Sequence, residues 1–147
     1  MKKIVSLLLV VLAFTMCACS QDRVVKYSDL PENAKKIISE YFSVEGISSI
    51  SIDREKGVDS EYEVRYDDGI EIDFSMKGEL IKVDCNRKQV PAGILPEKVL
   101  TYVQNNYPSS FVTEWEKSDK KTWKAELNSG IELKFNSNYQ IIGTDKD

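Results

Sequence analysis

The residues that could do chemistry in this sequence are almost all carboxylates. The chain has 24 Asp and Glu residues and no His. A Ser-His-Asp or Cys-His nucleophile, a His-ligated zinc ion and a neutral-pH imidazole base are therefore excluded by composition. The sequence contains neither a P-loop nor a GxGxxG motif. We expect a protein that is not an enzyme, with no catalytic residue and no cofactor.

Two groups of acidic residues could still form a site. Asp67 and Asp68 precede Gly69, and Asp-Gly is the sequence that a tight hairpin turn requires, so a turn is the favoured interpretation. The second group surrounds Gly57 and loosely resembles a calcium loop; it comprises Asp53, Glu55, Asp59 and Glu61. Its spacing does not fit an EF-hand. We expect a charged, solvated loop from Arg54 to Ser60 and no metal site, and keep calcium binding there as an alternative.

The N-terminus predicts export. Positive charge at Lys2 and Lys3 precedes an apolar run, Ile4–Met16, that is too short for the about 20 residues of a membrane span. Ala18 before Cys19 favours lipoprotein processing, with residues 1–18 as signal peptide and Cys19 as the lipidated first mature residue. Plain secretion with cleavage near Ser20 is the alternative. The expected location is the periplasm or cell envelope.

Charge and cysteine usage limit the partners further. Without the signal peptide, 18 basic residues remain against 24 acidic ones, a net charge of −6, so clustered cations for nucleic-acid phosphates are not expected.

Without the signal peptide, Cys85 is the one thiol besides Cys19. It continues the alternation of Ile81 and Val83, which predicts a buried apolar role rather than a reactive thiol.

The chain repeats itself. The segment Tyr62–Asp84 has a recognisable copy in Trp123–Asp145, and the amphipathic helix pattern that begins at Leu30 returns at Leu95. Strands with alternating apolar and charged residues follow each helix. This predicts an α+β fold of two tandem repeats, each a helix plus a four-stranded antiparallel meander in two layers. The expected divisions are a tether at 19–27, repeat 1 at 28–85, a linker at 86–94 and repeat 2 at 95–147.

Strand alternation assigns side chains to two faces of the sheet. The aromatic residues share the apolar register, which favours a core over a ligand platform: Tyr62, Tyr66, Phe74, Trp115, Trp123 and Phe135. The charged residues in the opposite register form the expected open face: Glu63, Arg65, Glu71, Asp73, Lys124, Glu126, Glu132 and Lys134. This face is the candidate binding surface for a partner.

The combination of these segments resembles one family. The doubled LPxx(A/V) helix start, the GIEIDF and GIELKF strands, the VDC segment and the VPAGILP link are similar to those of secreted PepSY-like, β-lactamase-inhibitor-like bacterial proteins. The resemblance covers nearly all of the mature chain. It implies the tandem helix-plus-four-strand fold of β-lactamase inhibitor protein and an envelope location. Inhibition of that kind uses aromatic anchors on the open face, whereas here that face is charged.

These observations predict that the protein functions by binding a partner. We expect a non-catalytic secreted or lipid-anchored envelope protein that binds an unknown envelope protein or peptide through the open sheet face, and touches the membrane only through its lipid. The alternative is an inhibitor or chaperone-like regulator of an envelope hydrolase or protease. A third possibility is a calcium or small-ligand sensor that uses the loop around Gly57.

Overall fold

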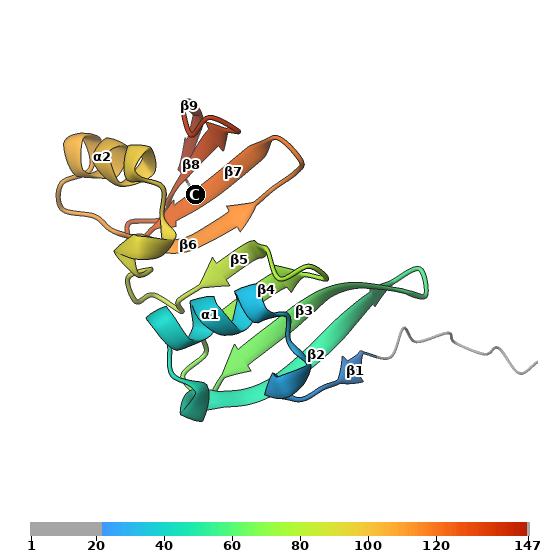
Figure 1. Ribbon diagram of the computed structural model, residues 1–147. Helices are drawn as coiled ribbons and strands as arrows, with labels where there is room; N and C mark the ends of the chain where they lie inside the picture. The colour runs from blue at the N-terminus through green and yellow to red at the C-terminus, as the bar shows by residue number, and fades with distance from the viewer. Residues whose placement is uncertain (1–21, 147) are drawn as a thin grey trace, which may run out of the picture.

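The computed structural model describes residues 22–146, which form two α-helices, three short 3-10 helices and one nine-stranded antiparallel sheet (Figure 1). The strands follow one another across the sheet in chain order from β1 to β9. The candidate signal peptide and Cys19 lie outside the described residues. The strands are β1 (Arg23–Val24), β2 (Ile47–Glu55), β3 (Val58–Tyr66), β4 (Glu71–Ser75), β5 (Leu80–Asp84), β6 (Val112–Lys117), β7 (Thr122–Leu127), β8 (Ile131–Asn136) and β9 (Ile141–Lys146).

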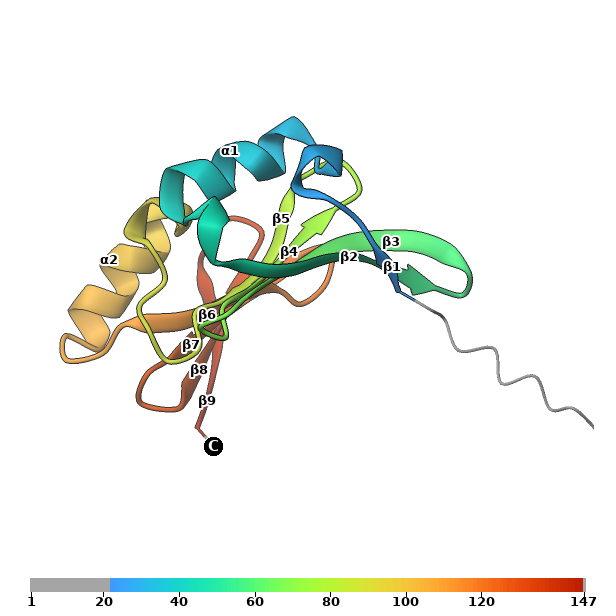
Figure 2. The same ribbon diagram turned by 90° about the horizontal axis from the view of Figure 1, so that it is seen from below.

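Both helices lie on the same side of the sheet (Figure 2). Helix α1 (Glu32–Tyr41) follows Pro31 and helix α2 (Glu97–Asn106) follows Pro96, because a proline at a helix start loses no hydrogen bond that the helix could use. Ala34 and Ile38 are the buried side chains of α1, and Val99 and Val103 are those of α2. Each pair is four residues apart, so it faces the sheet as one stripe.

The core lies between the helices and the sheet. Tyr62 pairs with Phe74 across β3 and β4, and Trp123 pairs with Phe135 across β7 and β8. Val83 of β5 pairs with Trp115 of β6, so the two halves of the chain share one continuous core. Burying each of these large side chains stabilises the fold by about 1.5–3 kcal/mol.

The predicted α+β class is confirmed, and the nine strands form a single continuous sheet. β5 pairs directly with β6, and the expected linker at 86–94 is itself packed into the fold. Val90 within it is buried, and its amide donates to the Val112 carbonyl at 2.8 Å. The sheet and its core therefore continue across the predicted boundary between the repeats.

Two expectations near β2 are wrong in detail. The predicted loop from Arg54 to Ser60 is a hairpin tip, since β2 and β3 continue to a tight turn at Lys56 and Gly57, both with positive φ. The predicted tether at 19–27 contains β1, which pairs with the outer edge of β2. Backbone hydrogen bonds hold β1 in this position. A strand of two residues is too short to be predicted from a pattern of side chains.

Candidate functional site

The charged residues assigned to the open face do lie on the side of the sheet away from the helices. They alternate along their strands with buried core residues such as Ile72 and Leu133. The structure brings them together in two groups. Glu63 pairs with Asp73 and Arg65 with Glu71; Lys124 pairs with Lys134 and Glu126 with Glu132.

Four further charged residues join these groups and are not among the residues predicted for the site. Lys82 and Asp84 on β5 pair with Glu116 and Glu114 on β6, at the middle of the sheet. Their own alternation with Val83 and Trp115 placed them on the open face. The sequence does not show that β5 and β6 are neighbours in the sheet, because these two strands are far apart in the chain. Without that contact, the four residues could not be joined to the two groups.

One row of six carboxylates crosses the sheet, and we call it the acidic stripe. It consists of Glu71, Asp84, Glu114, Glu126, Glu132 and Asp145, one from each strand from β4 to β9. Each member is the direct cross-strand partner of the next. With neighbouring strands about 4.8 Å apart, the stripe is about 24 Å long. Arg65 of β3 ends the row on one side.

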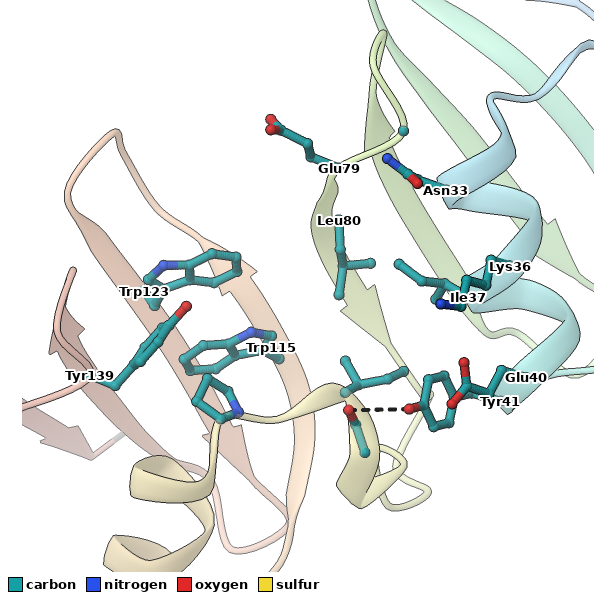
Figure 3. A pocket seen from close by; sticks show the side chains of 14 residues that line it. Asn33, Lys36, Ile37, Glu40, Tyr41, Glu79, Leu80, Trp115, Trp123 and Tyr139 are labelled. Atoms are coloured by element: carbon teal, nitrogen blue, oxygen red, sulfur yellow. Dashed lines mark hydrogen bonds between the residues drawn. The ribbon is translucent and has the colours of Figure 1, made fainter.

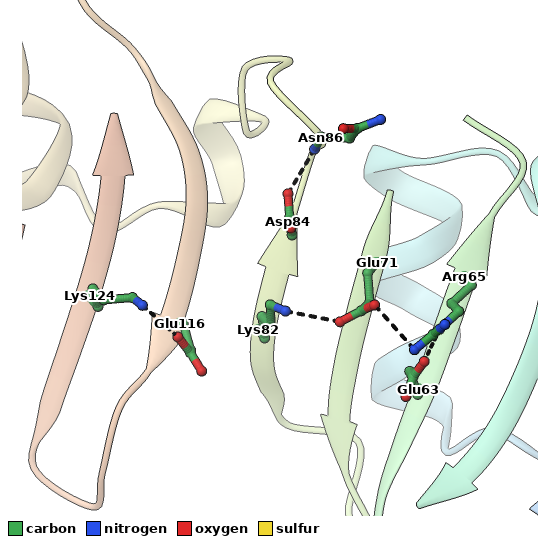
Figure 4. Close-up of polar contacts among 8 residues, drawn as sticks. All are labelled: Glu63, Arg65, Glu71, Lys82, Asp84, Asn86, Glu116 and Lys124. Atoms are coloured by element: carbon green, nitrogen blue, oxygen red, sulfur yellow. Dashed lines mark hydrogen bonds and ion pairs between the residues drawn. The ribbon is translucent and has the colours of Figure 1, made fainter. Parts of the chain in front are cut away.

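Cations in the adjacent row neutralise the two ends of the stripe but not its centre. Lys82 binds Glu71 at 2.9 Å (Figure 4). Lys134 binds Asp145 at 2.7 Å and approaches Glu132 at 3.4 Å. Lys124 binds Glu116, outside the stripe, at 3.2 Å and approaches Glu132 of the stripe at 3.6 Å.

The three central members of the stripe are Asp84, Glu114 and Glu126. Within residues 22–146 none of them forms an ion pair. Asp84 only accepts a hydrogen bond from the backbone amide of Asn86 at 2.8 Å. Burial raises the pKa of Glu114, although Lys82 and Lys124 oppose this. The centre of the open face is therefore a row of carboxylates with no cation bound to it.

Asp73, expected to be exposed on this face, is buried instead. Only 8% of its surface is exposed, and its Oδ1 atom has no hydrogen-bond partner in the described structure. Its cross-strand neighbours are Glu63 and Lys82, but the Lys82 ammonium donates to Glu71 instead. Burial, and then the charges of Glu71 and Glu61, raise the pKa of Asp73 to about 7.

The helix side carries a separate groove between α1 and the strands β6 and β7 (Figure 3). Its volume is about 480 Å³, and Trp115, Trp123 and Tyr139 form one wall. The two indoles stack with their centroids 4.8 Å apart and their planes within 6°. Trp115 is 2% exposed, whereas Trp123 is only half-buried. The predicted core role is confirmed for five of the six aromatic residues, and Trp123 lies at the core's edge.

The acidic residues near Gly57 do not converge on a point. Asp59 binds the guanidinium groups of Arg23 at 3.1 Å and Arg54 at 3.0 Å, while Asp53 accepts a hydrogen bond from the Arg54 amide. Asp53 and Glu61 face each other across β2 and β3. Across the described range 22–146, no three His, Cys, Asp or Glu residues are placed to hold a metal ion.

The remaining predicted features have structural roles. The Asp67-Asp68-Gly69 segment is a turn, in which Gly69 has a φ of +84° and Asp68 binds Lys88 at 2.7 Å. Cys85 is buried with 2% of its surface exposed, and burial raises the pKa of its thiol to about 11. Neither feature brings reactive groups together.

The sequence of the chain matches one protein family. The family model described as "Putative beta-lactamase-inhibitor-like, PepSY-like" matches residues 14–82 and 60–143. The chain belongs to this family. The two matches overlap over residues 60–82, from β3 to the start of β5, and do not meet at the expected linker. No curated protein matches the chain.

Solved structures from Bacteroides have the same fold. A "putative periplasmic protein from DUF2874 family" of Bacteroides vulgatus is 26% identical, with a TM-score of 0.81 over 87% of this chain and 99% of that one. A "putative calcium-regulated periplasmic protein" of Bacteroides thetaiotaomicron is 30% identical, with a TM-score of 0.79 over 85% and 97%. A second Bacteroides vulgatus protein, "of unknown function", is 28% identical, with a TM-score of 0.78 over 86% and 100%.

These relatives are described as periplasmic, and none of the descriptions names an enzyme. Neither helix that the structure describes is long and apolar enough to cross a membrane. The comparisons thus agree with an envelope location and with a family not described as catalytic.

Proposed function

We propose that this protein is a non-catalytic envelope protein that binds another protein or peptide through the open face of its sheet. The observation that carries the proposal is the acidic stripe, whose three central carboxylates have no counter-ion within the described structure. Among residues 22–146, both helices occupy the other side of the sheet and no helix covers this face. Charged groups arranged in register over several strands are suited to recognising a partner of complementary charge.

The proposal includes a lipid at Cys19 as the attachment to the membrane. Arg23, the first residue of β1, is four positions after Cys19. An extended segment of that length spans only about 13 Å. The lipid would therefore hold the β1 edge of the sheet close to the membrane surface, with the open face accessible from the side. Mass spectrometry of the mature N-terminus distinguishes this from secretion with cleavage near Ser20.

We also propose that the fold arose from two copies of one helix-plus-four-strand unit, related to the fold of β-lactamase inhibitor protein. The pairings of Tyr62 with Phe74 and of Trp123 with Phe135 support this, because the same sequence positions meet in both halves. The four turns after β3, β4, β7 and β8 also occur at corresponding places.

Position-specific photocrosslinking in the native cell envelope tests the binding function. One variant carries a photoreactive residue at Ser49, which pairs with Arg65 on the open face. The control carries it at Gln104, exposed on α2. We expect one discrete adduct from position 49 and none from position 104. Equal labelling from both positions, or an adduct from α2 alone, would contradict a binding role for the open face.

A second candidate is an inhibitor or chaperone-like regulator of an envelope hydrolase or protease, which the family description favours. It predicts stoichiometric loss of activity when the purified domain is added to a co-exported enzyme. Calcium or small-ligand sensing at the β2–β3 hairpin is the third candidate, and the Bacteroides thetaiotaomicron relative's description motivates it. Calorimetry that detects no heat at millimolar calcium would remove it.

A further inference from the structure

We propose that the occupant of the open face is a polybasic segment of a partner protein, whose Lys and Arg side chains bind along the acidic stripe. This inference rests on the proposed binding function and specifies the chemistry of the partner. Three observations carry it: the concentration of charge, the unpaired carboxylates, and the linear shape of the site.

Negative charge is concentrated on the open face. Residues 22–146 contain 18 basic and 23 acidic residues, a net charge of −5. The rows of the open face hold eleven of the acids but only four cations, a net charge of −7. The acids are Asp53, Glu61, Glu63, Glu71, Asp73, Asp84, Glu114, Glu116, Glu126, Glu132 and Asp145, and the cations are Arg65, Lys82, Lys124 and Lys134. The rest of the described chain is slightly positive, so a cationic partner is directed to this face.

The stripe lowers the stability of the isolated protein. Like charges directly opposite each other on neighbouring strands are destabilising, whereas opposite charges contribute about 0.2–1 kcal/mol per pair. Glu114 has Asp84 on one side and Glu126 on the other. Lys82 and Lys124 in the adjacent row offset part of this repulsion but form no ion pair with Glu114, so cations from outside would relieve the remainder.

Asp73 is an independent sign of a missing donor on the same face. Its side chain is more than nine-tenths buried, at 8% exposure, yet Oδ1 accepts no hydrogen bond in the described structure. It lies on β4 two residues after Glu71, the first member of the stripe. A buried polar atom without a partner costs about 1–3 kcal/mol. A guanidinium or ammonium group bound over β4 could supply this hydrogen bond only if the side chains that cover Oδ1 move, because that atom is itself inaccessible in the described structure.

The shape of the site favours a linear polycation over a metal ion. Calcium requires six to eight oxygen atoms converging on one point, and no such group is present among residues 22–146. The stripe instead extends in a line for about 24 Å, which matches about seven residues of extended chain at 3.3 Å per residue. A short run rich in Lys and Arg can therefore contact the whole stripe.

Fluorescence anisotropy with a labelled octalysine peptide tests the inference. The mature protein starting at Ser20 is titrated at 50 mM NaCl, and labelled octaglutamate serves as the probe of opposite charge. We expect saturable binding of octalysine and none of octaglutamate. Binding should weaken at least tenfold between 50 and 300 mM NaCl, because salt screens exposed ion pairs.

Matched variants distinguish binding at the stripe from a nonspecific effect of the protein's overall charge. The double variant Glu114→Gln/Glu126→Gln removes two charges from the stripe, and Glu40→Gln/Glu45→Gln removes two exposed charges at the C-terminal end of α1 and in the turn after it. We expect at least tenfold weaker binding for the first and less than twofold for the second. Asp73→Asn should weaken binding about threefold or more. Circular dichroism confirms that each variant is folded.

Three results would overturn the inference: no octalysine binding by the folded protein, equal losses in the two double variants, or displacement of the peptide by 1 mM calcium but not by NaCl of equal ionic strength. The last result would assign the stripe to a divalent cation. The result of the octalysine titration does not depend on the result of the crosslinking experiment. An adduct from position 49 without octalysine binding keeps the binding function and removes the polybasic partner.

Discussion

Replacing Asp73 with Asn should stabilise the protein at alkaline pH. The pKa of Asp73 is about 7 in the folded state, against 3.8 for an ordinary Asp. Because folding raises this pKa, the folded state binds more protons than the unfolded chain between these two values. Stability therefore decreases as pH rises through this window, and the full penalty is present above pH 7. At about 1.4 kcal/mol per pKa unit, the ceiling is about 4 kcal/mol.

Asn has nearly the same shape as Asp but cannot carry the charge, so the substitution isolates the electrostatic contribution. Oδ1 remains without a donor in the Asn variant, and the expected gain in the free energy of unfolding at pH 8 is therefore about 2–4 kcal/mol. At pH 4.5 the Asp73 carboxyl is protonated in the folded state, and the two proteins should agree within about 1 kcal/mol.

Urea denaturation at pH 4.5, 6 and 8 measures this effect. The fluorescence of Trp115 and Trp123 reports unfolding, since both side chains are partly or fully buried in the folded state. Glu45→Gln is the control, because it removes one charge from an exposed side chain; it should change stability by less than about 0.5 kcal/mol at every pH. An Asn variant equal to or less stable than the wild type at pH 8 would refute the burial of an unpaired charge.

Three other substitutions or reactions test the remaining structure. Cys85, whose pKa is raised to about 11 by burial, should not react with an aromatic disulfide reagent at pH 8 until the protein is unfolded in guanidinium. Gly78→Ala should destabilise by about 2–4 kcal/mol, because φ is +82° and a Cβ would lie 2.8 Å from Pro31; Gly57→Ala, with the same φ and open space, should cost only about 1–2 kcal/mol in urea denaturation. Glu126→Lys should stabilise by about 0.5–2 kcal/mol at pH 7, since it replaces two like-charge pairs with opposite-charge pairs. An unchanged or lower urea midpoint would argue against repulsion within the stripe.

The sequence predicted which face each strand residue occupies but not how the rows combine. Alternation along a strand is local, so Glu63 and Glu132 could be assigned to the open face without knowledge of any neighbour. The stripe depends on register between strands, where a slip of one residue exchanges the two faces. No pattern in β5 or β6 specified that Asp84 meets Glu114.

The burial of Asp73 could not be predicted for a related reason. Its pattern is that of a solvated charge between Ile72 and Phe74. Its exposure depends on the neighbouring strands, which place Glu63 and Lys82 directly beside it. The hairpin between β2 and β3 differs from the predicted loop because its charged residues have the composition of a loop, whereas backbone pairing holds them in strands.

The acidic stripe is better explained by binding than by folding. A sheet selected only for stability would place opposite charges across neighbouring strands, as Lys82 and Glu116 are placed in the adjacent row. Glu114 and Glu126 break that rule at the centre of the face, where a single Lys would remove the repulsion. Binding sites commonly retain such destabilising groups, because the partner supplies the missing interactions. The variant Glu126→Lys should therefore separate the two properties: it makes the isolated protein more stable and weakens its binding to a polybasic segment.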